Sequence, residues 1–137
     1  MSLFNVFDTA GSAMSAQSLR LNLTASNLAN AETVSGSPDT AYRSRQPVFA
    51  AALKAANGQQ PTAQVEVRGV VQSDAPVQPL YQPNNPQADG NGYVYRSNVN
   101  TVEEMVNMIS ASRSYQNNVE VMNTSKQLML QTLRLGR

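Results

Sequence analysis

The last third of the chain carries one long apolar stripe. Most of its residues recur at steps of three, four or seven positions, the spacing of one face of an α-helix. The stripe consists of Val102, Met105, Ile109, Tyr115, Val119, Met122, Met129 and Leu133. Thr101 is a suitable N-cap residue, and Gly136 stands where a C-terminal stop is expected. The pattern predicts one uninterrupted helix over residues 101–135.

The length of this helix constrains the shape of the protein. At about 1.5 Å per residue the helix would run roughly 50 Å. A compact globule made from 137 residues would have a diameter of only about 35–40 Å. The helix must therefore project from the fold or pair with an element of similar length.

A second long helix is predicted at the N-terminal end. Its apolar seam has the strict 4-3 spacing of a coiled coil. The seam consists of Leu3, Phe7, Ala10, Met14, Gln17, Leu21, Thr24, Leu28 and Ala31. Two amphipathic helices at the two ends of one chain are natural antiparallel partners. We expect Leu3, Phe7, Met14, Leu21 and Leu28 to pair within the subunit with Met105, Ile109, Val119, Met122, Met129 and Leu133.

The middle of the chain has weaker signals. The sequence predicts a turn-rich loop over 34–40 and a possible helical turn over 50–56. It also predicts a strand over 63–71, with Gly69 as a possible bulge. A proline-containing loop over 74–92 and a second strand over 93–95 follow. The predicted fold is mostly α with a small β module: two long terminal helices paired antiparallel like a coiled coil, and a central loop and β-hairpin insert. The predicted units are 1–33, 34–100 and 101–137.

Composition narrows the functional classes. The net charge is +1 and 14% of the residues are charged, so no electrostatic footprint for nucleic acid is present. The chain contains neither Cys nor His, which removes thiolate nucleophiles, the commonest general base and the commonest metal ligand. Glu103 and Glu104 point about 100° apart on a helix and do not form a glycosidase pair. Asp89 and Asn91 fit a turn better than a calcium loop. We predict no catalytic, cofactor or metal site, and hence no enzyme.

The polar faces of both predicted helices are unusually poor in charge. Between Met105 and Leu133 the charged residues are Arg113, Glu120 and Lys126. Depletion of Lys, Glu and Asp is typical of a buried interface rather than a free surface. The alternative interpretation is an ordinary soluble helical hairpin whose solvent-exposed surface is uncharged. The chain also lacks an apolar run of about 18 residues and a basic, apolar leader, so we expect neither a transmembrane helix nor a cleaved signal peptide.

Several motifs resemble one protein family. Ala25-Ser-Asn-Leu-Ala-Asn-Ala31, preceded by Ala16-Gln-Ser-Leu-Arg-Leu-Asn22, is similar to the N-terminal signature of bacterial flagellar rod and hook proteins. The stretches 86–94 and 98–106 resemble the proximal rod members of that family, and 113–118 fits their C-terminal helix. Three departures concern loops: Asn85 stands where His is usual, Ser97 where Pro is common, and the loop over 32–41 is longer.

The resemblance implies an axial subunit that polymerises helically into the proximal rod and transmits torque across the periplasm. The units 1–33 and 101–137 would form an inner axial domain, with 34–100 outside it. Implied partners are copies of the chain, other rod subunits, adaptors of the membrane ring and export gate, and the flagellar type III export apparatus, but no nucleic acid or small-molecule substrate. The expected assembly residues are Leu3, Phe7, Met14, Leu21, Asn27, Leu28, Asn30, Met105, Ile109, Tyr115, Val119, Met122, Met129 and Leu133.

Three alternatives differ from this interpretation. The chain could be another rod subunit of the same family, a peptidoglycan-cleaving enzyme that opens the cell wall for the rod, or an export chaperone. A cell-wall hydrolase would need a pair of carboxylates facing each other in a cleft. A free chaperone surface would carry more charge than these helices do.

Overall fold

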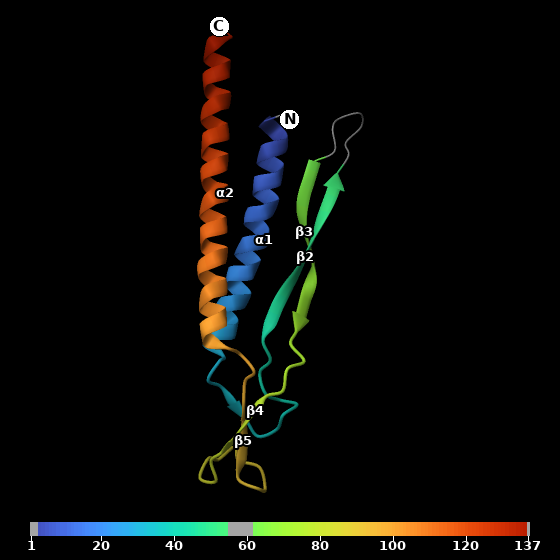
Figure 1. The fold of residues 1–137 in the computed structure, drawn as a ribbon, viewed down its shortest axis with the longest axis vertical. Coiled ribbons are helices and arrows are strands. Elements are labelled where there is room, and N and C mark those ends of the chain that lie inside the picture. Colours follow the sequence, from blue (N-terminus) through green and yellow to red (C-terminus); the bar gives the residue numbers. More distant parts are fainter. Residues whose placement is uncertain (1–2, 55–61, 137) are drawn as a thin grey trace.

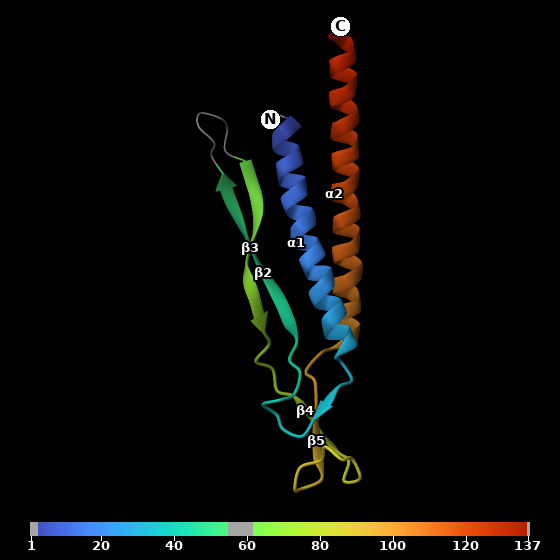
Figure 2. The same cartoon turned by 180° about the vertical axis from the view of Figure 1, so that it is seen from behind.

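The computed structural model describes residues 3–54 and 62–136. The elements are α1 (Leu3–Ala29), β1 (Val34–Ser35), β2 (Arg45–Lys54), β3 (Thr62–Gln72), β4 (Gln78–Tyr81), β5 (Tyr93–Arg96) and α2 (Thr101–Leu135). The two helices run antiparallel, and α1 lies between α2 and the hairpin formed by β2 and β3 (Figures 1 and 2). The prediction of two long terminal helices with a small antiparallel β module between them in the sequence is therefore confirmed.

Helix α2 has the predicted length but begins with a different cap. Asn100, not Thr101, is the N-cap, and its side-chain oxygen accepts hydrogen bonds from the backbone N–H groups of Val102 and Glu103. Asn100 has the extended backbone conformation of an N-cap residue, and its side-chain oxygen reaches both N–H groups, so Thr101 becomes the first helical residue. The predicted stop is confirmed, because the N–H of Gly136 bonds to the carbonyl of Thr132 at 3.2 Å.

The face that α2 turns toward α1 differs from the predicted stripe. Met105 and Ile109 are 52% and 55% exposed, whereas Glu104 and Ala111 are 3% and 0% exposed. The predicted pairing is therefore wrong for the first turns of α2. The small Ala111 allows close approach of the two helices, and Glu104 finds a polar partner on α1. One series of buried and half-buried positions has a 4-3 spacing: Glu104, Met108, Ala111, Tyr115, Asn118, Met122, Ser125 and Met129.

Helix α1 is covered on two sides. Among the described elements it contacts α2, β2 and β3. Several of its positions are almost fully buried although their side chains are small: Ala10, Ala16, Thr24 and Asn27 are 4%, 2%, 4% and 0% exposed. Small residues are what a helix needs when it is packed between two neighbours at short distance.

Strands β2 and β3 form a long antiparallel hairpin whose register runs from Arg45↔Gln72 to Lys54↔Thr62. Val48 pairs with Gly69 and Phe49 with Val67, so the predicted bulge is confirmed at this place. The predicted helical turn over 50–56 is wrong for 50–54, which belong to β2; residues 55 and 56 lie outside the described residues. Pairing with β3 and packing on α1 outweigh the helix propensity of the alanines.

The other strands form a small sheet of order β1-β5-β4 beyond the base of the helices (Figure 1). Val94 in the central strand is 0% exposed. The second predicted strand is thus confirmed as β5. The prediction that 74–92 is all loop is wrong, because β4 includes Pro79. A proline is tolerated there since β4 is an edge strand.

Two hydroxyl groups of α1 hold the hairpin against the helix. The Thr9 hydroxyl donates to the carbonyl of Ala63 at 3.0 Å, and the Ser12 hydroxyl accepts the N–H of Val65 at 3.1 Å. Both backbone groups belong to β3, so α1 satisfies part of the edge of this strand. An unpaired strand edge is otherwise a site for unwanted pairing.

Removing these hydroxyls should loosen the hairpin. In the double variant Thr9→Val, Ser12→Ala we expect the Val65 amide to exchange faster by about fivefold, since one hydrogen bond contributes about 1 kcal/mol. Hydrogen exchange followed by NMR measures this. Ser18→Ala, at an exposed position of α1, is the control. Unchanged exchange at Val65 in the double variant would contradict the prediction.

Candidate assembly site

The side chain of Asn27 joins three segments at the base of the two helices. Its amide NH2 donates to the carbonyl of Arg45 at 2.8 Å, to Glu104 Oε2 at 3.1 Å and to Ser44 Oγ at 3.3 Å. Its carbonyl oxygen accepts the N–H of Arg45 and the hydroxyl of Tyr42, both at 3.0 Å. Asn27 therefore connects α1 with α2 and with the first residue of β2.

Only asparagine suits this position. Asp offers no N–H donor, and Gln is longer by one methylene group. The amide bonds both backbone groups of Arg45 as a neighbouring strand would, which fixes the point where β2 begins. The partners are themselves shielded from water, with Glu104 3% and Ser44 7% exposed. An isolated buried carboxylate is costly, so the Asn27 amide also makes the burial of Glu104 tolerable.

Two further asparagines complete the junction. Asn98 Oδ1 accepts the N–H of Ser44 at 2.8 Å, and Asn98 Nδ2 donates to the carbonyls of Ala75 at 2.9 Å and Ser73 at 3.3 Å. Asn100 caps α2. These residues and Asn27 belong to the motifs that carry the family resemblance. The motifs thus hold the helices, the hairpin and the small sheet in one arrangement.

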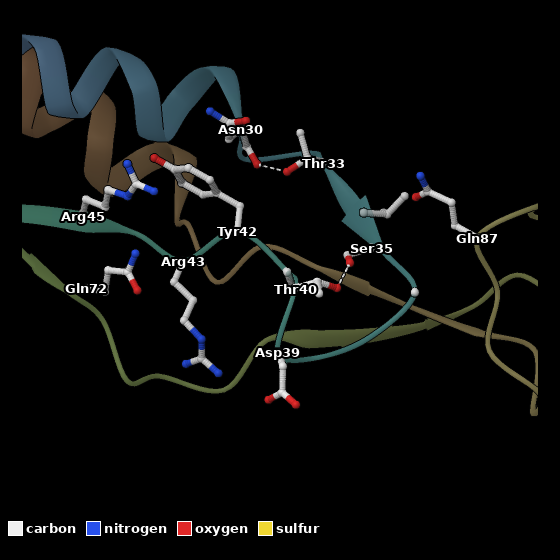
Figure 3. Close-up of a pocket in the computed structure, with 13 residues that line it drawn as sticks. Asn30, Thr33, Ser35, Asp39, Thr40, Tyr42, Arg43, Arg45, Gln72 and Gln87 are labelled. Carbon is white, nitrogen blue, oxygen red and sulfur yellow. Dashed lines mark hydrogen bonds between the residues drawn. The ribbon is translucent and has the colours of Figure 1, made fainter.

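A polar pocket of about 660 Å³ lies beside this junction (Figure 3). Arg45 stacks over the ring of Tyr42, with 5.5 Å from its guanidinium carbon to the ring centroid. The Arg43 guanidinium donates hydrogen bonds to the carbonyls of Ser73 and Ala75 at 3.4 and 3.3 Å. Asp39 lies across from these arginines on the long loop after β1 (Figure 3). These interactions hold the end of the loop over 36–44 against the start of β2 and the segment after β3.

Large apolar residues are exposed at both ends of α2. We call one group the base stripe: Val102, Met105, Val106 and Ile109, which are 67%, 52%, 62% and 55% exposed. We call the other group the C-terminal leucines: Leu128, Leu130, Leu133 and Leu135, which are 49%, 47%, 70% and 87% exposed. The C-terminal leucines lie where α2 extends past the N-terminal end of α1 (Figure 1). Exposed apolar groups of this density indicate surfaces that await a partner.

The expected assembly residues differ in their exposure to solvent. Asn27 is buried and Met105, Ile109 and Leu133 are exposed, while the side chain of Leu3 lies outside the described ones. The remaining residues are half-buried: Phe7, Met14, Leu21, Leu28, Asn30, Tyr115, Val119, Met122 and Met129. Sequence reasoning missed Glu104, because its place in the first turn was explained by the helix dipole alone. It also missed Val106 and Leu128, which interrupt the 3.6-residue period of the stripe.

The loop that closes the β4–β5 hairpin is organised by Asp89. Its carboxylate accepts the N–H groups of Asn91 and Tyr93, both at 2.9 Å, and the hydroxyl of Tyr95 at 3.1 Å. Gly92 has φ +82°, and a Cβ there would lie 3.0 Å from the Tyr81 ring, so only glycine fits. The predicted turn over 89–92 is confirmed. Within the described residues, no group of three acidic, His or Cys side chains could hold a metal ion.

This loop should respond to pH. The hydrogen bond from the Tyr93 N–H, with smaller ones from Asn91, Tyr95 and Gly92, lowers the pKa of Asp89 below its ordinary value of 3.8. The stabilisation is therefore present above pH 3.8 and lost as the pH falls through the lowered value. We expect the Tyr93 amide resonance to titrate in this range and to lose the titration in Asp89→Ala. Asp74→Ala is the control; a Tyr93 titration that persisted in Asp89→Ala would contradict the assignment.

Comparisons with known proteins identify the family. Residues 7–35 match the family described as "Flagella basal body rod protein", and residues 91–135 match "Flagellar basal body rod FlgEFG protein C-terminal". The chain is 56% identical to the flagellar basal-body rod protein FlgC of Salmonella typhimurium, over 100% of both chains. The chain belongs to the FlgC family. The FlgC proteins of Yersinia enterocolitica and of Buchnera aphidicola from Acyrthosiphon pisum are 55% and 42% identical over 100% and 99% of each chain.

Membership of the FlgC family settles the class of protein. The chain is a structural subunit of the proximal rod of the flagellar basal body, and it assembles with other rod components. The resemblance drawn from the sequence motifs is thereby confirmed. Full-length identity to FlgC proteins argues against the alternative of another rod subunit. No helix among the described residues has the combination of length and hydropathy needed to cross a membrane.

Proposed function

We propose that the chain polymerises helically with its own copies and other rod subunits, and that the rod transmits torque across the periplasm. The paired helices, units 1–33 and 101–137, form the inner layer around the axis as a coiled coil, and the module 34–100 lies outside them. The 4-3 spacing of the buried and half-buried set from Glu104 to Met129 on α2 supports a coiled coil. The role is mechanical, without catalysis or cofactor.

One observation carries this proposal. Among the described elements α2 contacts only α1, yet nine of its large apolar residues are exposed: Val102, Met105, Val106, Ile109, Val121, Leu128, Leu130, Leu133 and Leu135. A free surface would carry charge at such positions, whereas this helix has six charged residues in 35. Such a helix is suited to packing by neighbouring subunits on its remaining sides.

The Asn27 junction supports the mechanical part of the proposal. Torque applied to the outer module must reach the helices through their connection. The junction supplies hydrogen bonds from α1 to both β2 and α2, so the hairpin and the helices can rotate as one body. The expected assembly residues Leu3, Phe7, Met14, Leu21, Leu28, Asn30, Tyr115, Val119, Met122, Met129 and Leu133 stay part of this proposal.

We further propose that the chain reaches the rod through the flagellar type III export apparatus without a cleaved signal, and that it contacts adaptors of the membrane ring at the rod base. Membership of a family of flagellar rod subunits supports this proposal. Mass spectrometry of the chain in purified basal bodies tests it, because an intact N-terminal peptide is expected. A processed N-terminus would contradict the proposal.

Cryo-electron microscopy of purified basal bodies tests the proposed assembly. We expect density for two antiparallel helices near the rod axis, with the module 34–100 at larger radius. Helices at the rod surface with the β module inside would overturn the proposed arrangement. A separate assay tests the absence of catalysis: incubation of the purified chain with cell wall should release no soluble peptidoglycan fragments.

A further inference from the structure

We propose that the polar pocket beside the Asn27 junction is a binding site for a carboxylate, and that the guanidinium of Arg45 holds it. This inference goes beyond the proposed function, which gives the pocket no role. The volume of about 660 Å³ falls within the range of about 300–1,000 Å³ that is usual for ligand sites. The lining side chains come from the turn after α1, from β1, β2 and β3, and from the loops on either side (Figure 3).

The positive charge of this pocket is not neutralised within the chain. Neither of its two arginines belongs to an ion pair among the described residues. The hydrogen bonds that Arg45 makes to described residues involve only its backbone groups, so all five N–H groups of its guanidinium are left for a ligand. Arg43 uses Nη1 alone for the carbonyls of Ser73 and Ala75. The pocket therefore offers cationic donors that require an anionic acceptor.

Arg45 is oriented for a planar acceptor. Its guanidinium carbon lies 5.5 Å from the centroid of the Tyr42 ring, and stacking of this kind leaves the N–H groups at the edge of the guanidinium accessible. The ring is itself anchored, because the Tyr42 hydroxyl donates to Asn27 Oδ1 at 3.0 Å. A guanidinium fork matches the two oxygens of a carboxylate. A fork that is already oriented lowers the entropic cost of binding.

The wall opposite Arg45 is also held in place. The hydroxyls of Ser35 and Thr40 are hydrogen bonded to each other, and the Thr40 N–H bonds to the carbonyl of Ser37 at 3.3 Å. Gly36 lets this wall approach the loop between β4 and β5, because a Cβ there would lie 2.8 Å from the carbonyl oxygen of Gln87. The pocket is thus formed without a ligand, as ligand sites usually are.

The charges favour a single carboxylate over a dianionic phosphate. Asp39 lines the pocket opposite the arginines (Figure 3), so two arginines and one aspartate give the lining a net charge of +1. A monoanion balances this charge, whereas a second negative charge would face Asp39. The amides of Gln72 and Gln87 also line the pocket, and amides can pair with the N–H and C=O groups of a peptide. We therefore assign the carboxylate to an Asp or Glu side chain of a partner protein segment.

Titration of the full-length, ¹⁵N-labelled chain followed by NMR tests this site. The probe is the peptide acetyl-Gly-Glu-Gly-amide, and its Gln counterpart is the uncharged match. We expect the Glu peptide to shift the backbone amide resonances of Tyr42, Arg43 and Gln72 with a Kd in the millimolar range. The Gln peptide should bind about tenfold more weakly, because a hydrogen bond to a charged group contributes about 1.5–3 kcal/mol. Acetate should also bind more weakly than the Glu peptide.

Substitutions identify the group that holds the carboxylate. Arg45→Gln keeps the backbone bonds to Asn27 and should weaken binding of the Glu peptide about tenfold. Arg45→Lys keeps the charge without the fork and should give an intermediate loss. Asp39→Asn should strengthen binding about twofold, because it removes a like charge that faces the ligand. Arg134→Gln, at an exposed position of α2 outside the pocket, is the control.

Several results would overturn the inference. Equal binding of the two peptides, or an unchanged affinity in Arg45→Gln, would remove the carboxylate site. Tighter binding of inorganic phosphate than of the Glu peptide would make the pocket a phosphate site, and acetate binding as tightly as the Glu peptide would assign it to a free small acid. If Arg45→Gln failed to fold by circular dichroism, Arg45→Lys and Asp39→Asn would decide. Placement of the chain in the rod by cryo-electron microscopy is independent of all these outcomes.

Discussion

Asn27→Ala should lower the free energy of unfolding by about 2–4 kcal/mol, because each buried polar group left without a partner costs about 1–3 kcal/mol. The substitution removes the hydrogen bonds to Glu104, Tyr42 and both backbone groups of Arg45. Glu104 is the most serious loss, since its carboxylate is 3% exposed. Urea denaturation followed by circular dichroism measures the effect. The same variant should fail to restore swimming in a strain that lacks the native subunit.

Asn30→Ala is the matched control from the same motif. The Asn30 amide donates to the carbonyl of Ser26 in its own chain segment, and the residue is only half-buried. We expect its loss to cost less than about 1 kcal/mol. Equal destabilisation by the two alanine variants would show that the Asn27 junction is not a special site, and that general packing at the end of α1 explains both.

Asn27→Asp should give a destabilisation that depends on pH. The variant places a second carboxylate beside Glu104, where the native amide lies at 3.1 Å. Two carboxylates at this distance disfavour joint ionisation, and protonation of one of them restores a donor. The variant should therefore recover stability relative to the native chain as the pH falls from 7 toward 5. Asn27→Ala should show no such recovery.

The sequence predicted the parts of this fold that depend on local periodicity. The spacing of the apolar stripe was enough to predict the 35-residue helix α2. Local sequence patterns also predicted the 4-3 seam of α1, the strand β3 and the end of α2 at Gly136. The rotation of α2 about its axis was not predictable in this way. Met105 and Ile109 fit the apolar stripe, which does not include Ala111. Their exposure follows from the polar contact between Asn27 and Glu104, which are 77 residues apart.

The middle of the chain shows the same limit. Residues 50–54 are alanine-rich and favour a helix locally, but β3 and α1 offer a strand partner and a packing surface. Strand β4 contains Pro79. From the sequence alone this proline indicates a loop, because proline is accepted only in edge strands and the sequence does not show that β4 is one. The importance of Asn27 was indicated only by its motif, because a single asparagine in an amphipathic helix has no local signal that it bonds four other residues.

Ala111→Leu is expected to separate the two helices. Ala111 is 0% exposed on the side of α2 that faces α1, and a larger side chain there forces the backbones apart at a cost of about 1–3 kcal/mol. The displacement also moves Glu104, two turns earlier on the same side of α2, away from Asn27. We therefore expect a loss of stability near the upper end of this range, measured by urea denaturation, and a loss of swimming in the complemented strain.

Ser110→Leu separates this packing effect from a general effect of leucine in α2. Ser110 is exposed and adjacent in sequence, and leucine there improves helix propensity. Its free energy of unfolding should stay within about 0.5 kcal/mol of the native value. Normal stability and swimming in Ala111→Leu would mean that the helices tolerate a wider separation. The close contact at Ala111 would then not set the spacing of the inner layer. A different result would be a Ser110→Leu protein that is stable in solution but does not restore swimming to the complemented strain. That result would place a neighbouring subunit directly against that side of α2.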